Sequence, residues 1–143
     1  MPRRNLTRKS KFISVEISIK TDSDAEAFVK WFEAQDNYVA KLPCDSHKWY
    51  IYFAPIPWKD ADTTIRNLCA VIRELPSEVR KDWDEAGHRE FYAGYHVGDE
   101  LSNFAEYFDP ETLRAASDVN AGIGFTLYHA PLTNEEGMPE ELL

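Results

Sequence analysis

The chain has 143 residues, of which 43% are hydrophobic and 29% are charged, so it can form one compact domain with a packed core. No apolar run approaches the roughly 20 residues that a membrane-spanning helix requires, and two cysteines are too few for a disulfide scaffold. The formal net charge of −9 opposes nucleic-acid binding, because phosphates are bound mainly by Lys and Arg. We therefore expect a cytoplasmic protein that binds neither a membrane nor nucleic acid.

The charge is distributed unevenly along the chain. Residues 1–20 carry six basic side chains and one acid, Glu16, whereas the remaining residues carry a net charge of −14. We predict a basic flexible arm over residues 1–10, a single α+β domain over residues 11–131 and an acidic tail over residues 132–143. A domain of this charge attracts a basic partner, most simply a basic protein.

Hydrophobic periodicity predicts a strand and then a helix in the first part of this domain. Residues 11–20 alternate between apolar and polar side chains, which is typical of a half-buried strand. Ser23 followed by Glu26 has the spacing of a capping box, and the apolar stripe after it predicts a helix over residues 23–35.

A hairpin and two further helices are predicted next. Runs of β-forming residues over 38–42 and 48–54 flank a segment rich in turn residues, which indicates a hairpin. Asp60 or Asp62 begins a helix with the strongest apolar stripe in the chain. The stripe consists of Ile65, Leu68, Cys69, Ile72 and Leu75. A short helix carrying Trp83 follows Pro76.

The last part of the domain repeats a strand, helix and strand. Residues 90–97 and 122–129 alternate as half-buried strands do. Between them, Asp109 followed by Pro110 is typical of a helix start, and this helix should end near Asn120.

The order of elements is typical of the split βαβ, or ferredoxin-like, arrangement of the α+β class. We predict an antiparallel sheet with helices on one face, followed by an extra C-terminal α-β unit. The other face of the sheet would then be open and would carry the polar side of each strand.

This open face offers candidate binding residues. Tyrosine supplies apolar area and a hydroxyl group with little rotamer entropy to lose, so it is frequent at recognition surfaces. The candidate partner-binding residues are Tyr50, Tyr52, Tyr92 and Tyr128, together with Trp83 in its acidic helix. Alternatively, the tyrosines stabilise the sheet itself, or they join two copies of the chain in a homodimer through the sheet face.

A catalytic alternative rests on two residues of the same face. Glu16 and His96 form the best acid–base pair in the chain, because imidazole titrates near neutral pH. They would give a small-molecule-binding module or an enzyme with a pocket around them. Cys44 and His47 have the spacing of two zinc ligands, but no second pair completes a site, so we predict neither a metal nor a cofactor.

The C-terminal third of the chain resembles small uncharacterised bacterial α+β domains, some of which are linked to toxin immunity. The resemblance rests on Trp83, the strand from Arg89 to Tyr95, the helix start at Glu111 and the closing strand from Phe125 to Tyr128. It implies a fold and carries over no catalytic residue. We therefore expect an acidic protein-binding module, such as an adaptor, an inhibitor or an immunity-type protein.

Overall fold

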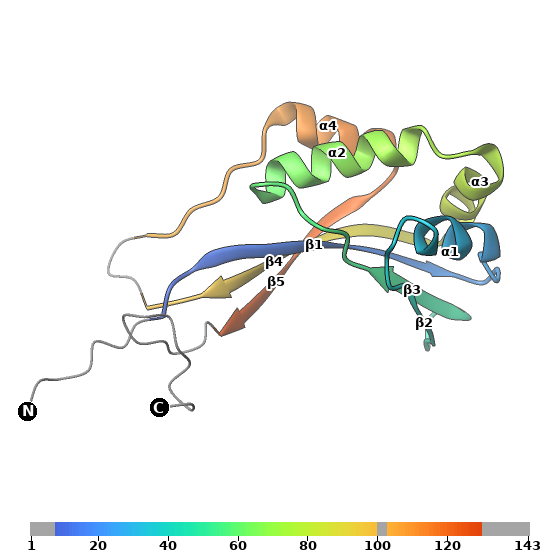
Figure 1. The fold of residues 1–143 in the computed structure, drawn as a ribbon, viewed down its shortest axis with the longest axis horizontal. Coiled ribbons are helices and arrows are strands. Elements are labelled where there is room, and N and C mark those ends of the chain that lie inside the picture. The colour runs from blue at the N-terminus through green and yellow to red at the C-terminus, as the bar shows by residue number, and fades with distance from the viewer. Residues whose placement is uncertain (1–7, 100–102, 130–143) are drawn as a thin grey trace, which may run out of the picture.

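The structure of the chain is a computed structural model, which describes residues 8–99 and 103–129. In these ranges it has an α+β fold, in which four helices lie on one face of a five-stranded mixed sheet (Figure 1). The predicted acidic tail and the first seven residues of the predicted basic arm lie outside the described residues.

The predicted elements are all present, with shifts at their ends. In chain order they are β1 (Lys11–Thr21), α1 (Glu26–Glu33), β2 (Ala40–Pro43), β3 (Trp49–Phe53), α2 (Ala61–Arg73), α3 (Ser77–Glu85), β4 (His88–Val97), α4 (Pro110–Asp118) and β5 (Gly122–His129). None of these helices has both the length and the apolar character that crossing a bilayer demands.

The strands lie in the order β2-β3-β1-β4-β5. Neighbouring strands are antiparallel except for β4 and β5, which are parallel. The predicted antiparallel sheet is therefore confirmed for the first four strands, and the extra C-terminal α-β unit adds β5 parallel to β4. The reason is that α4 carries the chain back to the end of the sheet where β4 begins, as a crossover between parallel strands must.

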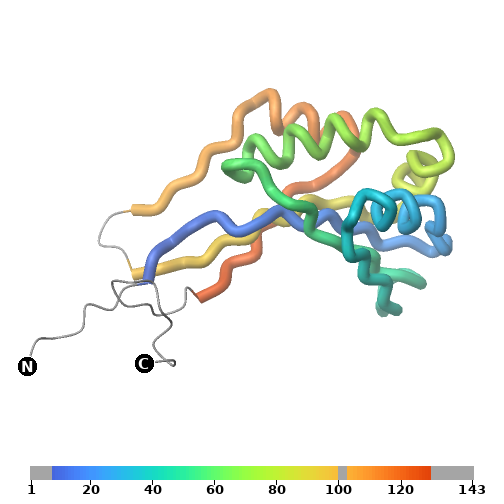
Figure 2. The backbone as a smooth tube through the Cα atoms, in the orientation of Figure 1, coloured from blue at the N-terminus to red at the C-terminus, as the bar shows by residue number. Residues whose placement is uncertain are grey.

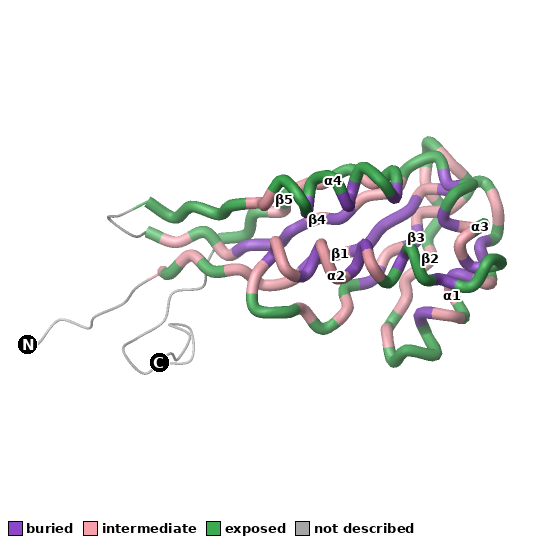
Figure 3. The backbone as a smooth tube through the Cα atoms, turned by 90° about the horizontal axis from the view of Figure 1, so that it is seen from above, coloured by how far each residue is buried: buried purple, intermediate pink, exposed green. Residues whose placement is uncertain are grey.

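The helix-covered face of the sheet forms the core. Alternate residues of β1 point toward the helices, and Val15, Ile17 and Ile19 are at most 1% exposed. Figure 3 shows this buried strip running along β1 and β4 beneath the helices. Figure 2 shows that the segment leading into α4 also runs on the helix side, where Phe104 contacts the Tyr95 ring. No described segment therefore covers the opposite face.

Two of the predicted helix starts are confirmed. The Asp60 carboxylate accepts a hydrogen bond from the backbone N–H of Thr63 and caps α2. The Asp109 carboxylate likewise accepts from the backbone N–H of Glu111 and caps α4, in which Pro110 is the first residue. The apolar stripe predicted for α2 is buried along its whole length.

The predicted start of α1 at Ser23 is wrong. The helix begins at Glu26, and the Ser23 hydroxyl instead lies 3.3 Å from that of Thr21. The N–H group of Phe28 in the first turn, which has no acceptor within α1, donates to the Asp82 carboxylate of α3 at 3.1 Å. A residue distant in sequence therefore supplies the acceptor expected from the local capping box, which a local sequence pattern cannot reveal.

Candidate functional site

The face of the sheet opposite the helices is polar and aromatic over its centre. β1 lies between β3 and β4, so its outward side chains have neighbours on both sides. Glu16 is paired with Tyr92 of β4, and Ser18 is paired with Tyr52 of β3. Tyr50 has the same orientation as Tyr52 two residues away, so the predicted residues of this region share one surface.

A depression of about 390 Å³ lies over this part of the sheet. Its walls combine two carboxylates with two tyrosine rings, an ammonium group, a thiol and a hydroxyl. The lining residues are Glu16, Lys20, Cys44, Tyr50, Glu90, Tyr92 and Thr126. Carboxylates beside aromatic faces form a favourable environment for a cation.

Glu16 is the carboxylate of this depression that forms no ion pair with a described residue. Its side chain is half-buried, and burial raises the pKa of Glu16 above its ordinary value. Within residues 8–99 and 103–129, no Lys, Arg or His nitrogen lies within ion-pair distance of it. An incoming cation would therefore relieve an unfavourable charge at this position.

The other carboxylate, Glu90, already has local partners. Its Oε1 atom lies 3.3 Å from Nδ1 of His88. Glu90 also accepts a hydrogen bond from the Tyr92 hydroxyl, and this bond, assisted by burial, raises the pKa of Tyr92 to about 12. Glu90 thus holds the Tyr92 ring in place, whereas the Glu16 carboxylate remains available to accept a hydrogen bond from a ligand.

The tyrosines of β3 form a stacked pair. The ring centroids of Tyr50 and Tyr52 lie 5.0 Å apart, with an angle of 29° between the ring planes. Burial, followed by the charge of Glu16, raises the pKa of Tyr50, so its phenol stays neutral. Nζ of Lys20 lies 6.0 Å from the centre of the Tyr50 ring. The face of the Tyr50 ring is therefore within cation–π distance of the Lys20 ammonium group.

The structure does not bring Glu16 and His96 together. Glu16 is opposite Tyr92, whereas His96 lies four residues further along β4, opposite Lys11. Four residues of strand span about 13 Å, which is far beyond the reach of a hydrogen bond. The His96 ring instead contacts the ring of Tyr128 at 6.5 Å between centroids, and its buried Nδ1 atom has no hydrogen-bond partner among the described residues.

Cys44 and His47 make local contacts in the turn between β2 and β3. The Cys44 thiol donates to the backbone carbonyl of His47 at 3.0 Å, and the His47 ring packs against that of His88. In the ranges that the structure describes, no three His, Cys, Asp or Glu side chains are grouped so that they could hold a metal ion. Cys69 is fully buried in α2, where burial raises the pKa of its thiol to about 11.

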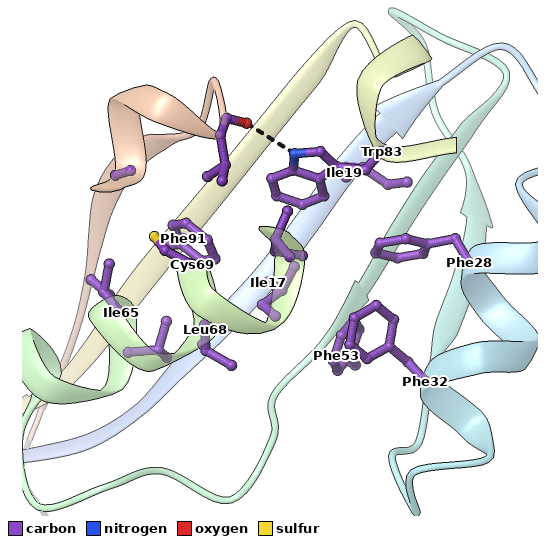
Figure 4. Close-up of a cluster of buried hydrophobic side chains, with 14 of the residues drawn as sticks. Ile17, Ile19, Phe28, Phe32, Phe53, Ile65, Leu68, Cys69, Trp83 and Phe91 are labelled. Atoms are coloured by element: carbon purple, nitrogen blue, oxygen red, sulfur yellow. Dashed lines mark hydrogen bonds between the residues drawn. The ribbon is translucent and has the colours of Figure 1, made fainter. Parts of the chain in front are cut away.

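Trp83 requires a correction, because it is a core residue and not a surface contact. It is 0% exposed and packs between the rings of Phe28 and Phe91. Its indole N–H donates to the backbone carbonyl of Val119 at 2.9 Å (Figure 4). The acidic residues around it suggested a solvated helix, but the apolar face of this short helix covers the sheet. Tyr128, by contrast, is 53% exposed on β5.

Three lining residues of the depression, Lys20, Cys44 and Glu90, were not placed there from the sequence. Lys20 and Glu90 could have been found from the alternation of their strands. Lys20 has the same orientation as Glu16 on β1, and Glu90 has the same orientation as Tyr92 on β4. Cys44 could not have been placed in this way, because it lies in the turn between strands.

Comparison of the chain with protein-family models, with curated proteins and with solved structures finds no match.

Proposed function

We propose that this chain is an acidic protein-binding module, an adaptor, inhibitor or immunity-type protein, which binds a basic protein through its open sheet face. The observation that carries the proposal is the half-buried Glu16 carboxylate, which lines the same depression as Tyr50 and Tyr92. A Lys or Arg side chain of the partner that entered this depression would supply the missing cation and contact the two aromatic rings.

The surroundings of the depression favour a protein partner. Tyr52 extends the aromatic surface beyond the depression, and Tyr128 offers an exposed ring on the same face. A few aromatic anchors around one desolvated charge are typical of the energetic centre of an interface. The net charge of −9 would accelerate the encounter with a basic protein at low ionic strength.

The proposed fold relationship concerns the first four strands. Their order, β2-β3-β1-β4, and their antiparallel pairing are those of the ferredoxin-like split βαβ arrangement. In this interpretation α4 and β5 are an addition to the fold, and the open face is the surface that such a sheet leaves free of helices.

A small organic cation is the second candidate ligand. The depression has the volume of a small-molecule site, and the same carboxylate and ring faces would hold an ammonium group. With His96 remote from Glu16, this candidate is a binding module without the acid–base pair.

The experiment compares capture of proteins by three baits from a lysate of the source organism, measured by quantitative mass spectrometry. The baits are the wild-type protein, Glu16→Gln and Glu33→Gln; the last removes the same charge from the exposed end of α1. We expect the wild type and Glu33→Gln to capture the same basic protein, and Glu16→Gln to bind it about tenfold more weakly. Raised salt should weaken this binding further.

Two outcomes would contradict the proposal. Equal affinity of Glu16→Gln and Glu33→Gln for the captured protein would move the binding surface away from the depression. Capture of no specific protein, together with binding of a small amine by the wild type alone, would favour the second candidate.

A further inference from the structure

The two edges of the sheet differ in how they are protected against pairing with another strand. β2, at one edge, has only four residues and contains Lys41 and Pro43. Short length, lysine and proline are the features by which proteins block an edge strand. β5, at the other edge, has eight residues with no proline, lysine, arginine or carboxylate among them.

The edge formed by β5 is also apolar on the helix side of the sheet. Phe125 is 57% exposed and Leu127 is 65% exposed, because α4 covers only the beginning of the strand. The backbone of β5 pairs with β4 on one side, and no described strand pairs with it on the other. A long, uncharged and apolar edge of this kind is a template for another strand.

We infer that β5 pairs antiparallel with β5 of a second copy of this chain, so that two sheets join into one. The net charge of −9 on each copy opposes association of two copies over most of the surface. β5 contains no Asp or Glu, so two copies can meet at this strand without placing its side chains as like charges beside one another.

The sequence of β5 is self-complementary in an antiparallel pair. An antiparallel pair centred on Phe125 places each Leu127 opposite Ile123 of the other copy, which gives a continuous apolar row on the helix side. On the open face, the same pairing places Tyr128 opposite Gly122. A methyl group added at Gly122 would meet nothing within 4 Å, so there is room for the tyrosine ring.

A hollow of about 570 Å³ lies between α4 and the beginning of β5, where a second copy would fill it. Its walls combine apolar Leu113, Ala116 and Ile123 with polar Arg89, Ser117 and Asn120. In the pairing centred on Phe125, Leu127 of the second copy lies at this hollow. The contact is isologous, so it closes at two copies and does not extend into a fibre.

Pairing at this edge places the two open faces side by side on one surface. Residues paired across antiparallel strands point to the same face of a sheet. The dimer would therefore present two copies of the depression that contains Glu16, and all helices would lie on the opposite side.

The test is the solution mass of the full-length protein by sedimentation equilibrium over a wide range of concentration. The wild type should be a dimer that dissociates on dilution. Leu127→Lys should raise the dimer dissociation constant by about two orders of magnitude, since it acts at two symmetric positions and each costs about tenfold. Ile56→Lys, at a residue that is 91% exposed in the loop after β3, should leave the constant unchanged.

Amide hydrogen exchange of the wild-type protein provides a second measurement that needs no variant. Exchange of residues 122–129 should slow as the protein concentration rises, while exchange of β2 stays constant. A protein that is monomeric at every concentration would overturn the inference. A dimer that persists in Leu127→Lys, with unchanged exchange in β5, would also overturn it. The same holds if Ile56→Lys raises the dimer dissociation constant as much as Leu127→Lys does.

Discussion

Replacement of Trp83 by phenylalanine separates a core role from a role in partner binding. The indole N–H donates to the Val119 carbonyl at 2.9 Å in a fully buried setting. A phenylalanine ring at this position would leave that carbonyl without its partner, which costs about 1–3 kcal/mol. The smaller ring also leaves a cavity and loses buried apolar area, which together cost about 1–2 kcal/mol. We expect Trp83→Phe to lower the free energy of unfolding by about 3 kcal/mol.

The assay is urea denaturation followed by circular dichroism, with thermal unfolding alongside. For a chain of this length a loss of about 3 kcal/mol lowers Tm by about 10 °C. Trp58→Phe is the matched control, since Trp58 is 45% exposed, and its effect should stay within about 0.5 kcal/mol. A loss below about 1 kcal/mol for Trp83→Phe would refute the assignment of Trp83 to the core.

Three further predictions test the contacts of α1 and of the open face. Asp82→Ala removes the cap that α3 supplies to α1 and should cost about 1–2 kcal/mol in urea denaturation, whereas Asp84→Ala, at an exposed ion pair, should cost less than about 0.5 kcal/mol. Equal losses would contradict the cap. Glu16→Gln should raise the stability at pH 7, and this gain should vanish below about pH 4.3, because burial raises the pKa of Glu16 and penalises only its charged form. A gain that persists unchanged at low pH would contradict this reasoning. A methyl group at Gly124 would lie 2.3 Å from the Tyr92 ring, so Gly124→Ala should displace the ring and lower the pKa of Tyr92 from about 12 toward 10, as measured by NMR titration. An unchanged titration would show that the ring has not moved.

The secondary structure was largely predictable from the sequence, because its signals are local. The alternation in β1 and the apolar stripe of α2 each follow from the period of the element that contains them. The helix caps at Asp60 and Asp109 were also readable, since each carboxylate binds an N–H group within three residues.

The predictions from the sequence were wrong where a residue distant in the sequence makes the contact that a neighbouring residue was expected to make. The capping box at Ser23 has the correct spacing, but Asp82 binds the N–H group of Phe28 from another helix. The acidic residues around Trp83 suggested an exposed helix, yet Asp82, one of these residues, caps α1. Periodicity within one segment contains no information about such a partner.

The candidate site was predictable as a face and not as an arrangement of side chains. Alternation placed Glu16 and His96 on the same side of the sheet, and this is correct. Their separation depends on the register between β1 and β4, which includes a shift between Phe12 and Ser14. The pattern of a single sequence does not fix the register between strands that are distant along the chain. The distance between Glu16 and His96 could therefore not be predicted, although the pair could be proposed.

Glu16→Gln should have opposite effects on stability and on partner binding, and these two effects connect the stability of the fold to the proposed function. A half-buried carboxylate without a counter-charge destabilises the folded chain at neutral pH, so Glu16→Gln should make the protein more stable. The same substitution removes the charge that a basic partner would neutralise, so it should weaken binding. A residue with a purely structural role would not combine these two effects, because its loss would lower stability and binding together. Higher stability together with weaker binding would therefore indicate that the open face binds a partner and does not merely stabilise the sheet.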